Sequence, residues 1–229
     1  MIKRIYTLPY LSTNTFILFL ILILFIASCT PLYELARQGD LATFRTELQN
    51  QPQSINIQDV DGNTPLHWAA KREDLAMVNL LLQNNNVDVN IQDVDGNTPL
   101  HWAARNDFPQ VIALLTHHRA NMNIPDVNGN TPLHWAAHFN HPQIVVLLKQ
   151  HGANLNIQNI HGNTPLHLVV NNNNLNLVVF LVDIGGANIT VTNNNNEIPK
   201  DLAIRKSYSR IENFLKNRAI LDLLKAWRL

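Results

Sequence analysis

A seven-residue string that returns at a nearly constant interval constrains this chain more than any other feature. TPLHWAA occurs three times and is followed by a variant, TPLHLVV, and the prolines of the four copies stand at 65, 99, 132 and 165. Weaker copies lie one such interval before the first of these prolines and one after the last, around Pro31 and Pro199. A unit of this size cannot bury its own apolar face, so the repeat predicts a stack of similar units. The four strong copies begin at Thr64, Thr98, Thr131 and Thr164.

Each strong copy has the residues of a turn followed by two helices. A glycine stands two positions before each threonine, behind Asp or Asn residues that favour turns, and glycine tolerates a positive φ there. Thr64 is suited to cap a helix that begins at Pro65, where no N–H is needed. In the second helix, apolar residues recur at i, i+1, i+3 and i+4, as in 77–81, which is helical and not strand periodicity.

This pattern resembles the ankyrin repeat from about Thr30 to Leu215. The resemblance implies an all-α solenoid of helix-turn-helix units joined by β-turns, with capping repeats at its ends. In that family the histidine of TPLH bonds to the backbone of the adjacent turn, so we expect a structural role for it. The structural positions of the motif are Thr64, Pro65, His67, Thr98, Pro99, His101, Thr131, Pro132, His134, Thr164, Pro165 and His167.

The register predicts how the chain is divided. We expect an N-terminal capping unit over 29–60, four full repeats over 61–193, and a degenerate repeat plus a capping helix over 194–229. The capping helix is predicted over 217–229, with an apolar side formed by Ile220, Leu221, Leu224 and Trp227. From Lys200 onward, eight basic residues stand against three acidic ones, an excess of five. A basic helix can contact an anionic membrane, although a soluble cap is the simpler interpretation.

The segment 1–28 is predicted to be a signal peptide or an N-terminal membrane anchor. Lys3 and Arg4 precede an uninterrupted apolar stretch, 16–27. Its length suits a secretory signal, which needs about 7–15 apolar residues, better than a spanning helix, which needs about 20. An uncleaved single-pass anchor and an ordinary cleaved signal, which would give a secreted protein, remain as alternatives.

The apolar stretch ends in Ile26-Ala27-Ser28-Cys29, which resembles the bacterial lipobox. The resemblance implies removal of the segment 1–28 and lipidation of Cys29, with acyl chains such as palmitate. Two or more acyl chains anchor a protein stably, so we expect a lipoprotein on a bacterial cell membrane. Cys29 is the only cysteine, so an intrachain disulfide is not possible.

Composition and motifs disfavour several functions. The 17 basic residues are balanced by 17 acidic ones, whereas nucleic-acid binders usually carry a basic excess, so no nucleic-acid partner is expected. No supported Ser/His/Asp arrangement or phosphate-binding glycine loop occurs, so we expect no enzyme and no cofactor. The spacing of His134, His138 and His141 could hold zinc, but no Cys or nearby carboxylate completes the ligands, so no metal site is predicted.

The resemblance implies binding of a protein partner of unknown identity, by a chain that we expect to be monomeric. Partners of such arrays usually contact the turn tips and the exposed face of the first helices, and Phe139 is our first candidate for a hot spot. We expect Trp68, Trp102 and Trp135 to pack between repeats and not to form a ligand stripe. The candidate partner-binding residues are Val60, Asp61, Lys71, Arg72, Val94, Asp95, Arg105, Asn106, Val127, Asn128, His138, Phe139, Ile160 and His161.

One observation points to a second hypothesis. Residues 56–70 and 90–104 are identical, tips included. Recent duplication explains this identity without selection for one particular partner, although a repetitive partner would explain it as well. The alternative function is therefore a structural or spacer protein of the envelope that has no specific partner.

Overall fold

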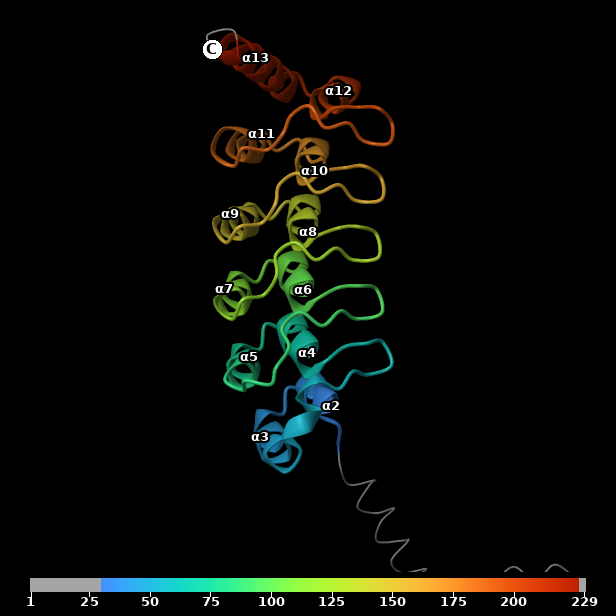
Figure 1. The fold of residues 1–229 in the computed structure, drawn as a ribbon, viewed down its shortest axis with the longest axis vertical. Coiled ribbons are helices and arrows are strands. Elements are labelled where there is room, and N and C mark those ends of the chain that lie inside the picture. The colour runs from blue at the N-terminus through green and yellow to red at the C-terminus, as the bar shows by residue number, and fades with distance from the viewer. Residues whose placement is uncertain (1–29, 227–229) are drawn as a thin grey trace, which may run out of the picture.

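The computed structural model describes residues 30–226, so the apolar N-terminal segment and Cys29 lie outside the described residues. Figure 1 shows a column of helix pairs, with the first helices in one layer, the second helices in another, and loops projecting beyond the first layer. This is the all-α repeat solenoid that the sequence predicts, and the described residues contain no strand. The pairs are α2 (Leu32–Gln38) with α3 (Leu41–Asn50), α4 (Pro65–Lys71) with α5 (Leu75–Leu82), α6 (Pro99–Arg105) with α7 (Pro109–His117), α8 (Pro132–His138) with α9 (Pro142–Gln150), α10 (Pro165–Asn171) with α11 (Leu175–Val179), and α12 (Pro199–Arg205) with α13 (Ser209–Ala226). A short 3₁₀ helix, η1 (Pro52–Asn56), follows α3, and a π-helical turn, η2 (Phe180–Ile184), continues α11.

The first helix of each full repeat begins as its residues require. The Thr64 side chain accepts the backbone N–H of His67, and Pro65 occupies the first helical position of α4. Leu66 and the alanine pair at 69 and 70 are buried, and the small alanines let neighbouring first helices approach closely. The Thr-Pro start, the buried leucine and the buried pair that follows recur in α6, α8 and α10, except that two valines replace the alanines in α10.

The loops that project in Figure 1, which we call the fingers, span 58–63, 92–97, 125–130, 158–163 and 192–197. Backbone hydrogen bonds join each finger to the next, as when the Val94 N–H donates to the Asp61 carbonyl oxygen at 3.0 Å. Gly62 has a φ of +79°, and a Cβ there would lie 2.7 Å from the Val94 nitrogen. The predicted positive φ is therefore confirmed, and the close approach of the next finger gives a second reason for glycine.

The C-terminal end differs from our expectation. We predicted a separate capping helix from Asn217, but α13 continues without a break from Ser209 to Ala226, because no proline or glycine interrupts it. Beyond the last unit, nothing in the described part of the chain covers its apolar side, so Ile220, Leu221 and Leu224 are about half exposed. Trp227 lies outside the described residues.

Within residues 30–226, no helix combines the length and the apolar character that crossing a membrane would require.

Candidate functional site

The histidine of each TPLH motif is buried and hydrogen-bonded through both ring nitrogens. In the first copy, Nδ1 of His67 accepts the Thr64 backbone N–H at 3.1 Å, and Nε2 lies 3.0 Å from the Asn97 carbonyl oxygen in the next finger. Because an amide N–H only donates and a carbonyl only accepts, His67 is the neutral tautomer with its proton on Nε2. Burial lowers the pKa of His67, His101 and His134 to about 4. These rings hold the repeats together and offer no free nitrogen to a metal or a substrate.

The histidines with metal-like spacing do not converge. His134 is held by Thr131, the His138 ring packs edge-on against Trp135, and Nε2 of His141 lies 3.0 Å from the Arg105 carbonyl oxygen. Over residues 30–226, no group of three or more His, Cys, Asp or Glu side chains is arranged to hold a metal ion.

The three repeat tryptophans are half-buried and turned toward the fingers. The indole N–H of Trp68 donates to an Asp59 carboxylate oxygen at 2.8 Å, and the second and third copies repeat this bond at 2.9 and 3.0 Å. Burial acts to raise the pKa of Asp59, but hydrogen bonds from Asn63, Trp68 and Asp61 outweigh it and lower that pKa. Each tryptophan thus ties its helix to its own finger and leaves its ring faces open to the neighbouring units.

Cationic side chains fill the spaces between these rings. The Lys71 ammonium lies 4.8 Å from the Trp68 ring centroid and 3.9 Å from that of Trp102. The Arg105 guanidinium carbon lies 5.2 Å from the centroids of both Trp102 and Trp135. Such contacts each contribute about 0.5–2 kcal/mol, more as water is excluded. We call the alternating series the cation–π ladder, and its members are Arg37, Trp68, Lys71, Trp102, Arg105, Trp135 and Phe139.

Phe139 ends the ladder. Its ring stacks on Trp135 with centroids 5.8 Å apart, and the Arg105 guanidinium carbon lies 5.6 Å from its centroid. Phe139 is nevertheless 40% exposed, so a partner can still contact it.

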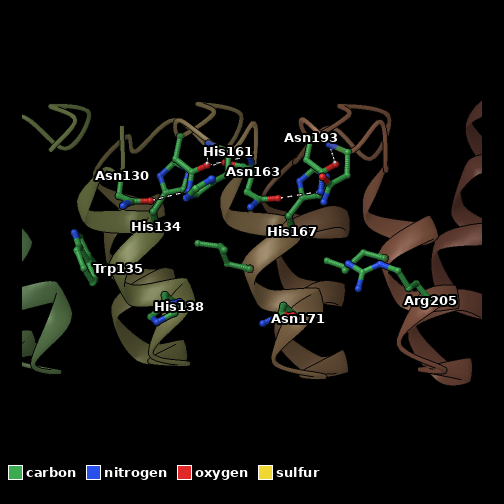
Figure 2. Close-up of a pocket in the computed structure, with 14 residues that line it drawn as sticks. Asn130, His134, Trp135, His138, His161, Asn163, His167, Asn171, Asn193 and Arg205 are labelled. Carbon is green, nitrogen blue, oxygen red and sulfur yellow. Dashed lines mark hydrogen bonds between the residues drawn. The ribbon is translucent and has the colours of Figure 1, made fainter. Parts of the chain in front are cut away.

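Beyond Trp135 the ladder stops and the same face hollows out. Leu168 and Leu202 occupy the positions of the tryptophans, and Asn171 occupies that of Lys71 and Arg105. These shorter side chains leave a pocket of about 410 Å³ across α8, α10 and α12. In Figure 2, Trp135, His138, Asn171 and Arg205 lie along the helices, and His134 and His167 lie nearer the fingers. The pocket is lined by Asn130, His134, Trp135, His138, Asn159, His161, Asn163, His167, Leu168, Asn171, Asn193, Asn195, Leu202 and Arg205.

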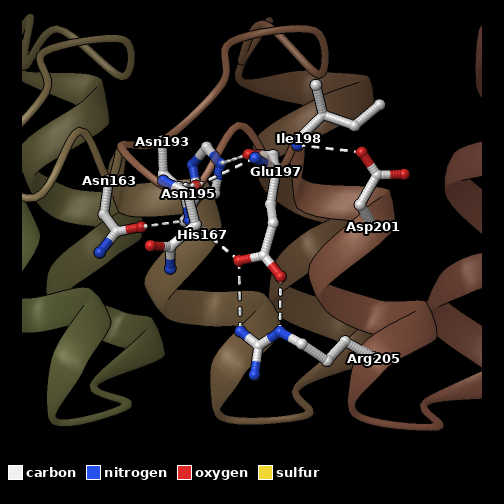
Figure 3. A network of polar contacts seen from close by, with 8 residues as sticks. All are labelled: Asn163, His167, Asn193, Asn195, Glu197, Ile198, Asp201 and Arg205. Carbon is white, nitrogen blue, oxygen red and sulfur yellow. Dashed lines mark hydrogen bonds and ion pairs between the residues drawn. The ribbon is translucent and has the colours of Figure 1, made fainter.

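A polar network closes the far wall of the pocket (Figure 3). The Arg205 guanidinium donates two hydrogen bonds to the Glu197 carboxylate, which lower the pKa of Glu197. The backbone carbonyl of Glu197 also accepts from the His167 ring at 3.1 Å. Arg205 is therefore already paired, and the pocket presents little net charge at this wall.

Most of the candidate partner-binding residues are exposed. Of the fourteen, only Lys71 is half-buried, because it lies between two indole rings. Asn106 has a partner within the array, since its side-chain amide lies 3.5 Å from the Lys71 carbonyl oxygen. The tips of the first four fingers carry one β-branched residue each, and these are 55–95% exposed: Val60, Val94, Val127 and Ile160.

The pocket and the Trp–Asp bonds were not predicted from the sequence. The signal for the pocket was present, because the fourth copy departs from the others at 168 and 171. Which way those side chains point relative to the fingers required the structure.

A family model described as ankyrin repeats (3 copies) matches the chain over residues 32–126, 71–159 and 110–193. These overlapping matches together span residues 32–193, well over half of the chain, and include all four strong copies. No curated protein matches the chain.

Proposed function

Because the chain belongs to the ankyrin-repeat family, we propose that it is a non-catalytic module for protein–protein interaction. The observation that carries the proposal is the row of exposed β-branched side chains at the finger tips. Backbone hydrogen bonds from each finger to the next hold this row in place, so a partner would meet preformed apolar contacts. The rest of the binding surface is the side of the first helices that bears the ladder and the pocket.

Site-specific photocrosslinking tests this surface in the cells from which the chain comes. A photoreactive phenylalanine analogue at Val94 or Val127 should capture one and the same partner. The matched control is Gln143, which is exposed on α9 in the layer away from the fingers. Changing the flanking tips with Val60→Asp and Ile160→Asp should abolish capture, whereas Gln110→Asp on α7 should not.

Two outcomes would contradict this assignment. Equal capture from Gln143 would move the interface off the fingers. No capture from any position would favour the alternative, a spacer protein without a specific partner, which the identical segments 56–70 and 90–104 motivate.

We further propose that lipid on Cys29 holds the array at a bacterial membrane. The support is the lipobox-like end of the apolar stretch, residues 26–29. Intact mass of the purified chain should show a protein that begins at Cys29 and carries acyl chains, and Cys29→Ser should prevent both changes. A chain that keeps residues 1–28 would indicate an uncleaved anchor, and an unlipidated shortened chain would indicate secretion.

A further inference from the structure

The pocket lies where the side chains of the array no longer fill the spaces between the aromatic rings of adjacent repeats. Equivalent positions along the first helices carry Lys71, Arg105, His138 and Asn171. The first two of these side chains lie over tryptophan rings of their own and the next unit. His138 instead packs edge-on against Trp135 and Phe139, and Asn171 lines the open pocket. Lys71 and Arg105 fill the equivalent spaces in the two earlier units. Beside Asn171 this space is open to a group from another molecule.

The charges around this space differ from those around the ladder. Lys71 lies in the field of Asp59, Asp61, Asp93 and Asp95, all of which favour its charged form. At the equivalent positions, the two fingers beside Asn171 carry no carboxylate: Asn159, His161, Asn193 and Asn195.

On the side of the pocket that faces the ladder, the one remaining carboxylate already accepts a hydrogen bond. Asp126 accepts the Trp135 indole N–H and is only 7% exposed. At the far wall, Glu197 is paired with Arg205. An entering cation would lack a free carboxylate and would lie between Arg105, which faces Trp135, and Arg205. An entering anion would find the pocket's one guanidinium already paired, so the pocket matches an uncharged group.

The walls indicate the chemistry of that group. Trp135 and Leu168 are half-buried, and together with Leu202 they offer an indole ring and two branched aliphatic side chains. The rim carries side-chain amides. Those of Asn159 and Asn193 donate to other asparagines of the array, whereas Asn171 is exposed on α10. Amides can hydrogen-bond both to peptide N–H groups and to peptide carbonyls.

We propose that this pocket takes one uncharged aromatic or large aliphatic side chain from an extended segment of a protein partner, whose peptide groups bond to the exposed amide of Asn171. The inference rests on the proposed protein-binding function and adds the chemistry of the residue that is recognised. A volume of about 410 Å³ is in the range of small-ligand sites and accommodates one large side chain with its flanking peptide groups.

The test uses blocked amino acids, so it does not depend on knowing the partner. The N-acetyl amides of Trp, Leu, Lys and Glu are titrated into the array, and the indole N–H resonances are followed by NMR. The Trp and Leu probes should shift the Trp135 resonance in a saturable way, at millimolar concentrations, and leave Trp68 and Trp102 unchanged. The Lys and Glu probes should bind at least about tenfold more weakly.

Two variants should close the pocket in different ways. Asn159→Asp, Leu168→Trp and Asn171→Arg together copy the second repeat into the fourth, and Asn171→Trp alone places a ring at an exposed position where folding should tolerate it. Both should lower probe affinity at least about tenfold. The control Gln110→Arg, on the other helix layer, should leave it unchanged.

Equal binding of charged and uncharged probes, no saturable shift at Trp135, or unchanged binding to both closed variants would each overturn the proposal. Crosslinking from the finger tips is read out separately. A partner captured there by an array that binds no probe would refute the pocket and leave the proposed function intact.

Discussion

Two stretches of one array, α2 to α8 and α8 to α12, share a backbone and differ in what covers it. In the first stretch, the alternating rings and cations of the ladder cover the side of the first helices that borders the fingers. In the second, leucine and asparagine replace them and leave the pocket. The motif histidine nevertheless bonds to the next finger at 3.0 Å in the first copy and 3.1 Å in the fourth. Positions that build the repeat are therefore independent of positions that shape its surface, so the surface can change without disturbing the stack.

Acidification should have the largest effect, and it should act on both stretches. The TPLH histidines of all four copies have a lowered pKa, to about 4 in the first three. Their stabilisation is complete above pH 6.5. It is lost as pH falls toward 4, because the unfolded chain takes up protons there and the folded chain does not. We expect a loss of up to about 3 kcal/mol for each histidine with a pKa near 4.

Urea unfolding at pH 7 and at pH 4.5 measures this loss. NMR titration of the His67, His101 and His134 ring protons provides the matching control, since they should not titrate near pH 6.5. A free energy of unfolding that is unchanged between the two pH values would contradict the buried neutral rings.

Alanine substitutions at equivalent positions should destabilise the two stretches to different extents. Trp102→Ala removes a ring that contacts both Lys71 and Arg105 and leaves Asp93 without its indole donor. We expect the free energy of unfolding to fall by about 3 kcal/mol. Leu168→Ala, at the half-buried equivalent position, should cost roughly 1 kcal/mol, since its side chain borders the open pocket and no hydrogen bond is lost with it. An equal loss of unfolding free energy in the two variants would mean that the ladder residues pack no better than those beside the pocket.

The features that can be read from the sequence are those that each unit requires locally. The period, the Thr-Pro starts and the glycines at positive φ are local requirements, so TPLH and the preceding Gly predict them. At the turns between paired helices, Glu73 and Asp107 adopt a positive φ of 55° and 62°. Glutamate is not among the residue types enriched in that conformation, so Glu73 gave no local signal of it. There the stacking of the helices imposes the backbone, and local propensity does not.

The ladder and the pocket could not be predicted for a related reason. Lys71 contacts Trp102 in the next repeat, and such contacts depend on the rise and twist between units. The sequence shows only that 168 and 171 depart from the pattern. The continuous α13 was missed because we treated the basic and apolar residues from 217 onward as a new element, although nothing in 209–226 breaks a helix.

Restoring the aspartate and the tryptophan of the earlier copies in the fourth copy should extend the ladder into the pocket. Asn159→Asp with Leu168→Trp supplies an indole and the carboxylate that accepts its N–H, as Asp126 does for Trp135 at 3.0 Å. We expect a gain of about 1 kcal/mol in the free energy of unfolding. Leu168→Trp alone should gain less, because its indole N–H lacks that acceptor. A loss of stability in the double variant would show that the two stretches differ in backbone spacing and not only in side chains.

The smallest effect concerns the cations themselves. Lys71→Met keeps most of the length of the side chain and removes its charge, its cation–π contacts with two indole rings and its hydrogen bond to Asn63 at 2.6 Å. Burial lowers the pKa of Lys71 even though nearby carboxylates oppose this, so the desolvation of the ammonium offsets much of what the rings and carboxylates contribute. We therefore expect a loss of only about 0.5–1 kcal/mol. Asn171→Ser, at the equivalent position beside the pocket, should change the free energy of unfolding by less than about 0.5 kcal/mol. A double-mutant cycle of Lys71→Met with Trp102→Phe isolates the ring contact, and a coupling energy near zero would mean that Lys71 only fills space between the rings.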